Sequence, residues 1–194
     1  DIDTARVAGL RAGTSHLGDD VTSADLARCR VRWEAAPEVL ASADVVIVAV
    51  PTPLHDGGPD LRPVRAAMST VVDHLRPGQL IVLESTTYPG TTEEVLRPLV
   101  EATGLKVGID VGLAFSPERV DPGSAWAVAT TPKIVGGVTP ADSALASLFY
   151  RSFVPAVHVT SSPREAEMAK LIENTFRQVN IALAPSHVEP MVPI

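Results

Sequence analysis

The chain has 194 residues, 45% of them hydrophobic, which fits one domain, or one domain plus part of a second, with a packed core. Its formal net charge of −7 at pH 7 argues against nucleic acid as a partner, and its single cysteine excludes an internal disulfide framework. No apolar run approaches the roughly 20 residues that a membrane-spanning helix needs, so we expect a cytoplasmic protein without a membrane partner.

Short elements are predicted in the first 42 residues. Residues 1–3 are interpreted as the end of a strand that continues into a helix, and Gly13 ends that helix. Three short elements follow: a helix at 23–28, a strand at 31–33 and a helix at 37–42.

Buried strands alternate with helices from residue 44 onward. The β-branched run at 44–50 is bounded by Pro51-Thr52-Pro53, which predicts a buried strand ending in a rigid turn, followed by a polar loop at 55–60. The other strands are predicted at 80–83, 111–115, 134–137 and 156–160, and the helices between them at 63–75, 93–103 and 141–150. This alternation predicts an α/β fold, a doubly wound parallel sheet with helices on both faces.

Polar loops follow three of these strands. They are Pro51-Thr52-Pro53, Ser85-Thr86-Thr87 and Ser116-Pro117-Glu118-Arg119. Ligands of doubly wound sheets bind outside the carboxyl ends of the strands, so the three loops together predict a binding site. Taken singly, the same residues could serve the fold alone: Glu118 and Arg119 could form salt bridges, and Thr52 and Thr86 could cap turns.

The longest run free of Gly and Pro, residues 164–183, predicts the last helix. Its apolar residues step by three and four, which indicates one helix face: Ala169, Ile172, Phe176, Val179 and Leu183. Lys170, Asn174 and Arg177 share one polar edge of this helix. That edge could line a site for an anionic ligand, or it could be an ordinary solvated edge.

Five segments resemble the nucleotide-sugar dehydrogenases, the family of UDP-glucose and GDP-mannose 6-dehydrogenases. In chain order they are residues 48–54, 84–92, 115–123, 132–137 and 166–183. The wording of residues 85–92 and 116–123 is most similar to the branch that oxidises UDP-N-acetylglucosamine. The resemblance implies oxidation of a UDP-sugar C6 alcohol to the carboxylate, with NAD as the cofactor, in polysaccharide or cell-surface sugar biosynthesis.

The resemblance also implies roles for matching residues. The implied catalytic residues are Lys170 and Asn174, which would stabilise the oxyanion at C6, Glu118 as acid or base, and Thr86, which would hold the hydrolytic water. The implied cofactor-binding residues are Asp1, Arg6, Pro51, Thr52, Ser85 and Thr86. The implied substrate-binding residues are Ser116, Glu118, Arg119, Lys170, Asn174 and Arg177. No metal site is expected, because the five histidines lie in unrelated contexts.

The chain departs from the family pattern at both ends. Residues 1–160 match a Rossmann-like NAD-binding domain without its first βα unit, which carries the glycine-rich loop in the family. Residues 161–184 match the start of the central helix through which family members dimerise, and the proline-rich residues 185–194 look unrelated. The family's nucleophilic cysteine lies in a later domain, and Cys29 does not match it.

Two hypotheses about function follow from these departures. The first is the N-terminal part of a UDP-sugar 6-dehydrogenase, truncated at both ends. The second is a catalytically inactive fragment that binds NAD or a nucleotide sugar without turnover. A weaker third hypothesis is a relative that acts on a 3-hydroxyacid.

Overall fold

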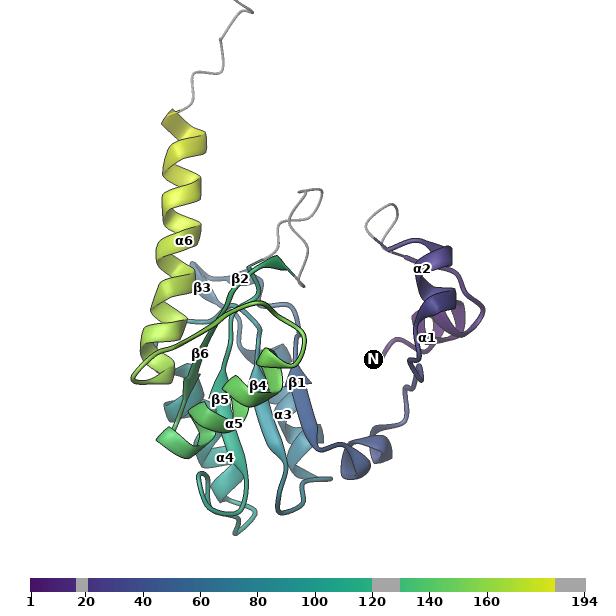
Figure 1. The fold of residues 1–194 in the computed structure, drawn as a ribbon, viewed down its shortest axis with the longest axis horizontal. Coiled ribbons are helices and arrows are strands. Elements are labelled where there is room, and N and C mark those ends of the chain that lie inside the picture. The colour runs from purple at the N-terminus through teal and green to yellow at the C-terminus, as the bar shows by residue number, and fades with distance from the viewer. Residues whose placement is uncertain (17–20, 120–129, 184–194) are drawn as a thin grey trace, which may run out of the picture.

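A five-stranded sheet forms the centre of the computed structural model, which describes residues 1–16, 21–119 and 130–183 (Figure 1). The strand order is β1-β4-β5-β6-β7. The strands are β1 (Val45–Val48), β4 (Leu80–Leu83), β5 (Gly112–Phe115), β6 (Lys133–Gly137) and β7 (Val157–Val159). The helices are α1 (Thr4–Arg11), α2 (Ser23–Arg28), the 3-10 helix η1 (Pro37–Ser42), α3 (Arg62–Val72), the π-helical turn η2 (Thr92–Leu96), α4 (Arg97–Glu101), α5 (Pro140–Arg151) and α6 (Pro163–Leu183).

The strands β4 and β5 have no polar side chain and are buried at every position, because helices cover both faces of the sheet. Ile81 and Leu83 belong to a core shared with α3 and α4, whereas Leu80 and Val82 pack in a second core with α5. This alternation follows from the two-residue period of a strand. The predicted α/β class, with helices on both faces, is therefore confirmed.

One strand pair differs from the predicted parallel sheet. The strand β5 pairs with β6 in antiparallel orientation, while β1, β4 and β5 are parallel neighbours, as are β6 and β7. An antiparallel neighbour needs no helical crossover, and no helix is predicted between the strands at 111–115 and 134–137. Glycines at the end of β6 allow close packing here: a Cβ on Gly136 would collide with the Ser162 carbonyl oxygen, and one on Gly137 with the Ser143 amide nitrogen.

Residues 1–16 and 21–36 lie beside the β1 edge of the sheet, apart from it (Figure 1). The predicted strands at 1–3 and 31–33 are wrong, since the described chain has no strand before Val45. Strands need a pairing partner, and within the described ranges no strand pairs with the outer edge of β1. Arg11 instead fastens the extended 31–34 segment to α1, through the Trp33 carbonyl at 2.7 Å and the Glu34 carboxylate at 2.6 Å.

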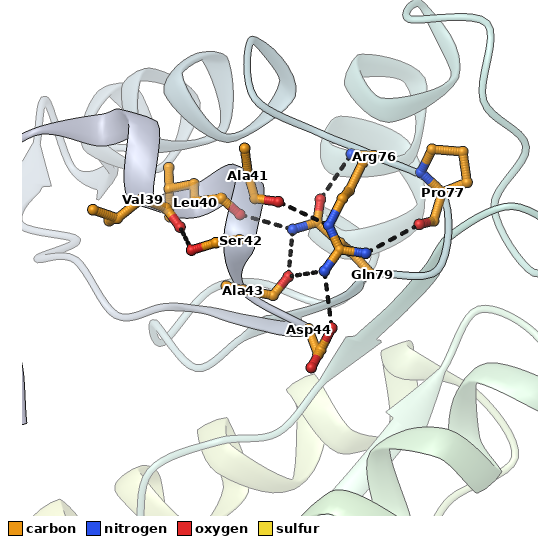
Figure 2. A network of polar contacts seen from close by, with 9 residues as sticks. All are labelled: Val39, Leu40, Ala41, Ser42, Ala43, Asp44, Arg76, Pro77 and Gln79. Atoms are coloured by element: carbon orange, nitrogen blue, oxygen red, sulfur yellow. Dashed lines mark hydrogen bonds and ion pairs between the residues drawn. The ribbon is translucent and has the colours of Figure 1, made fainter. Parts of the chain in front are cut away.

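Arg76 and Gln79 close the amino end of the sheet (Figure 2). The buried Gln79 amide donates to the carbonyls of Leu40, at 2.8 Å, and Ala43, at 2.6 Å, and accepts from the Arg76 backbone N–H at 2.8 Å. The Arg76 guanidinium donates to the carbonyls of Ala41 and Ala43 and pairs with Asp44 at 2.8 Å. These contacts attach η1 and the start of β1 to the start of β4.

The predicted polar loop at 55–60 contains a small hairpin, formed by β2 (Leu54–His55) and β3 (Gly58–Pro59). Its two turn residues, Asp56 and Gly57, both have positive φ, at 50° and 78°. Such turns match the twist of an antiparallel pair, and Asp-Gly is a preferred sequence for them. The Asp56-Gly57 pair is therefore the local sequence signal for this hairpin, which the prediction of a plain polar loop did not include.

Two helices depart from their predicted form. The helix predicted at 93–103 begins as the π-helical turn η2, in which the Arg97 N–H bonds to the Thr92 carbonyl; Pro98, without an N–H, follows at once. The predicted apolar face of α6 is largely exposed: Ile172 is 61% and Phe176 71% accessible, and only Pro163, Ala166 and Glu167 are buried. The predicted tail at 185–194, and residues 120–123 of one family-like segment, lie outside the described residues.

Candidate functional site

Two of the predicted loops are bound to each other at the carboxyl ends of β1 and β4. The Ser85 hydroxyl accepts the Val50 N–H and donates to the Val50 carbonyl, both at 2.8 Å. The Thr52 hydroxyl donates to the Thr86 carbonyl at 2.7 Å. Ser85 is buried, whereas Pro51 is exposed and Thr52 and Thr86 are half-buried. Ser85 therefore has a structural role between the loops.

A buried ammonium group joins the ends of β4 and β5. The side chain of Lys133, at the start of β6, is 4% exposed, and its Nζ lies 2.8 Å from Glu84 Oε1 and 3.5 Å from Glu118 Oε2. The same Nζ donates to the Pro117 carbonyl at 3.3 Å and lies 5.2 Å from the centre of the Tyr150 ring. The Tyr150 hydroxyl donates to Glu84 Oε1 at 2.6 Å. Burial, and then the Glu84 charge, raise the pKa of Tyr150, which keeps this donor protonated.

The loop at 116–119 is attached to α6 by two cations. Lys170 Nζ donates to the Glu118 carbonyl at 2.5 Å. The Arg119 guanidinium pairs with Glu173 at 2.6 Å and donates to the Pro132 carbonyl at 2.9 Å. The structure thus brings three predicted site residues together: Glu118, Arg119 and Lys170.

The other two residues of the predicted polar edge lie further along α6. Asn174 is half-buried, and its side chain makes no hydrogen bond to the described residues. Arg177 lines an open cavity of about 570 Å³, whose other walls are Arg119, Glu173, Phe176, Asn180 and Ile181. The interpretation of this edge as an ordinary solvated edge therefore fails for Lys170, whose ammonium group bonds to the loop at 116–119. The same interpretation stays open for Asn174.

Asp1 and Arg6 lie on the N-terminal segment, beyond the β1 edge (Figure 1). The Asp1 carboxylate accepts the Asp3 N–H at 2.9 Å and pairs with Arg6 at 3.2 Å. The side chains of Asp1 and Arg6 are 38% and 44% exposed, so both are accessible to a ligand. Cys29, at the end of α2, is also exposed, and the described residues contain no cluster of three or more His, Cys, Asp or Glu that could hold a metal.

A buried carboxylate anchors the loop after β4 to α6. Glu167 is fully buried, and its oxygens accept the Gly90 N–H at 2.5 Å, the Thr92 N–H at 2.9 Å and the Thr92 hydroxyl at 2.7 Å. Burial raises the pKa of this carboxyl group. Gly90 has a φ of 103°, a conformation that favours glycine.

Three buried polar atoms lack a hydrogen-bond partner within the described part of the chain: Thr87 Oγ1, Ser116 Oγ and Arg119 Nε. All three belong to the loops after β4 and β5. Buried polar atoms are normally paired, so these three are candidates to hydrogen-bond a bound ligand. Of these residues, sequence reasoning assigned roles to Ser116 and Arg119 and none to Thr87.

Sequence reasoning also missed Glu84, Lys133 and Glu167. Lys133 opens an otherwise apolar strand, which was a usable signal for a buried ion pair. For Glu167 the usable signal was its neighbour Ala166, a small apolar residue. Ala166 is one of the few α6 residues that pack in the core. The partners of both residues are distant in sequence, so the pairs themselves could not be predicted from local pattern.

Comparison with known proteins gives a consistent result. The profile of the UDP-glucose/GDP-mannose dehydrogenase family, NAD binding domain, matches residues 1–154. The chain is 44% identical over 148 residues to a UDP-N-acetyl-D-mannosamine dehydrogenase of Pyrococcus horikoshii, covering 76% of this chain and 35% of that protein. It is 37% identical over 191 residues to a UDP-N-acetyl-D-glucosamine 6-dehydrogenase of Pseudomonas aeruginosa, covering 94% of this chain and 44% of the relative.

The fold comparison agrees with the sequence comparison. A solved UDP-D-ManNAc dehydrogenase from Pyrococcus horikoshii superposes with a TM-score of 0.89 at 37% identity, covering 95% of this chain and 45% of that one. The chain thus spans less than half the length of the relatives it matches.

Proposed function

Because the chain belongs to the UDP-glucose/GDP-mannose dehydrogenase family, with residues 1–154 as its NAD-binding domain, we propose that it contributes to the oxidation of a UDP-N-acetylhexosamine at C6. UDP-N-acetylglucosamine is the proposed substrate, because residues 85–92 and 116–123 resemble that branch. The P. aeruginosa and P. horikoshii relatives carry the names of dehydrogenases for the two UDP-N-acetylhexosamine epimers, glucosamine and mannosamine. Both relatives thus support this class of sugar, and neither name decides between the epimers.

The convergence of Lys170 and Glu118 at the carboxyl end of the sheet carries the proposal. Oxidation of an alcohol places developing negative charge on the sugar oxygen, and a fixed ammonium group stabilises that charge. Lys170 would supply this cation, and Asn174, one turn further along α6, would donate to the same oxygen. The Glu118 carboxylate would move the proton or orient the water that completes the conversion to a carboxylate. Thr86 would hold that water.

The residues of this chain fit NAD, which when bound would accept one hydride from C6 in each of the two oxidation steps that take the alcohol to the carboxylate. The Asp1 carboxylate is partly exposed and has unused lone pairs on both oxygens, as ribose hydroxyls require. Arg6 beside it, Pro51, Thr52 and Thr86 would complete the cofactor-binding residues, while the buried Ser85 holds the two loops together. Ser116, Arg119 and Arg177 would bind the nucleotide sugar, because the two guanidinium groups suit its phosphates.

The exposed face of α6 supports pairing with a second copy of the chain. Its apolar side chains recur every three or four residues and are all at least 45% accessible: Met168, Ile172, Phe176, Val179 and Leu183. An apolar stripe of this length is normally covered. Light scattering coupled to size exclusion tests it: the chain should run as a dimer, and Phe176→Glu should run as a monomer. A wild-type monomer at high concentration would contradict pairing.

The activity is tested by incubating the chain with NAD and UDP-N-acetylglucosamine and following NADH absorbance. UDP-N-acetylmannosamine and UDP-glucose serve as parallel substrates. Sustained NADH formation with an N-acetylhexosamine supports the dehydrogenase. Binding of NAD or a nucleotide sugar in calorimetry without NADH supports the alternative, a binding fragment without turnover. Absence of both binding and turnover would contradict the proposal.

A further inference from the structure

Two of the three lysines in the chain contact the same short loop. The chain has only Lys106, Lys133 and Lys170. Lys170 donates to the Glu118 carbonyl from α6, and Lys133 donates to the Pro117 carbonyl from β6. Residues 117–118 are therefore held by ammonium groups from two different elements.

Lys133 also contacts the Glu118 side chain. Its Nζ lies 3.5 Å from Glu118 Oε2, and the other carboxylate oxygen, Oε1, accepts the Arg119 N–H at 2.6 Å. Although the Glu118 side chain is 44% exposed, these contacts on both oxygens restrict its orientation. A long, flexible carboxylate at the surface would otherwise sample several rotamers.

Lys133 is itself held by residues that the proposed chemistry does not use. Glu84 Oε1 lies 2.8 Å from its Nζ, and the same oxygen accepts the Tyr150 hydroxyl. The side chains of Lys133 and Glu84 are 4% and 15% exposed. A buried charge is costly unless it is paired, and an apolar side chain could fill the first position of β6 without that cost. The bond to Pro117 and the proximity to Glu118 are what an apolar residue could not supply.

We infer that Lys133 is a positioning residue of the site: held by Glu84 and Tyr150, it fixes the loop at 116–118 and orients the Glu118 carboxylate beside Lys170. This inference rests on the proposed function, because the purpose of the orientation is to present Glu118 to the sugar nucleotide. The simpler alternative is an ion pair that only stabilises the fold. The two roles predict different effects of replacing Lys133. Loss of a positioning residue should loosen the loop at 116–118 alone, whereas loss of a structural ion pair should destabilise the whole domain.

The experiment compares Lys133→Met, Lys133→Arg and Lys106→Met in the full chain. Lys106 is exposed before the amino end of β5 and serves as the matched control. Hydrogen exchange is measured at the amides of Glu118 and Arg119, with Ile81 in β4 as an internal reference. UDP-N-acetylglucosamine affinity is measured by calorimetry.

We expect Lys133→Met to accelerate exchange at Glu118 and Arg119 about tenfold relative to Ile81 and to weaken UDP-N-acetylglucosamine binding about tenfold. Lys133→Arg should restore both to within about threefold, because it retains the charge and can donate to Pro117. Lys106→Met should change neither. Should Lys133→Met fail to fold, Glu84→Gln removes the charge that holds Lys133 while leaving an oxygen for Tyr150, and the same loop-specific changes are expected, with smaller size.

Equal acceleration of exchange at the loop and at Ile81, with unchanged affinity, would overturn the inference in favour of a purely structural ion pair. In that result wild-type binding still stands, so the proposed function is unaffected. If the wild-type chain does not bind the nucleotide sugar, the proposed function fails, and the role of Lys133 at the site fails with it.

Discussion

The amino and carboxyl ends of the sheet are both closed by polar groups, but they differ in how completely those groups are paired. At the amino end, both hydrogens of the Gln79 amide and its oxygen have partners, and Arg76 donates to the backbone around it (Figure 2). At the carboxyl end, Thr87, Ser116 and Arg119 each keep a buried polar atom without a partner among the described residues. A fully paired network stabilises a fold, whereas unpaired buried groups are available to a ligand.

Lys170→Met tests the carboxyl end and should produce the largest effect. If Lys170 stabilises the oxyanion at C6, its loss should lower the rate of NADH formation by about 10²–10³-fold, equivalent to about 3–4 kcal/mol of transition-state stabilisation. Stopped-flow absorbance of NADH measures this rate. Lys106→Met is the control, and it should retain the wild-type rate. A Lys170→Met variant with a rate near that of wild type would remove Lys170 from the chemistry.

Gln79→Leu tests the amino end and should lower stability alone. It leaves the half-buried Leu40 carbonyl and Arg76 N–H without their side-chain partner, which should cost about 2–3 kcal/mol of unfolding free energy. Urea titration measures this loss, with the exposed Gln178→Leu as control. NAD affinity of the folded variant should match that of wild type. A loss of affinity without a loss of stability would show that the two ends are not separable in this way.

A pair of serines sharpens the comparison within the carboxyl end. The Ser85 hydroxyl forms two hydrogen bonds to Val50, whereas the Ser116 hydroxyl forms no well-aligned hydrogen bond in the described chain, although it lies near enough to Tyr150 to lower the pKa of that phenol. Ser85→Ala should therefore cost about 2 kcal/mol of unfolding free energy, and Ser116→Ala less than about 0.5 kcal/mol. Ser116→Ala should still weaken binding of the nucleotide sugar. Similar stability losses for both variants would mean that the Ser116 hydroxyl is paired inside the protein.

The buried Glu167 carboxyl group should give the smallest effect, a pH dependence of stability. Its folded pKa is raised by burial above the unfolded value, so the folded state binds more protons between the two pKa values. The contribution to unfolding free energy is therefore fully present below the unfolded pKa and is lost as the pH rises through the folded pKa. Urea titrations from pH 4 to 8 should show this decline in wild type and a weaker decline in Glu167→Gln. Parallel pH profiles for the two proteins would contradict it.

The apolar strands were the most predictable part of the fold. Residues 80–83 were predicted with their observed bounds, because a short, uninterrupted apolar run is itself the pattern of a buried strand. The β5–β6 orientation and the absent strand at 31–33 were not predictable in this way, since pairing depends on distant partners. For the same reason the apolar face of α6 was correctly placed on the helix, while its exposure was not anticipated.

The candidate site was likewise predictable from the sequence only in part. The loops and the residues Glu118 and Lys170 followed from the order of elements and from the family resemblance. The contacts that hold them, from Lys133 to Glu84 and from Glu167 to Gly90, span 49 and 77 positions of the chain. Only tertiary structure brings such groups together. Local patterns therefore identify groups that carry chemistry more readily than those that hold them in place.

The outer edge of β1 has a consequence for handling the protein. Its backbone N–H and C=O groups on that side have no strand partner within the described chain (Figure 1). The Ile47 side chain on the same strand is 41% exposed. Such an edge is a template on which another extended segment can add itself. Purified chains should consequently tend to aggregate through β1 at high concentration, separately from the pairing through α6, so the Phe176→Glu monomer is expected at low concentration. A soluble peptide that pairs with this edge as an added parallel strand would block this association.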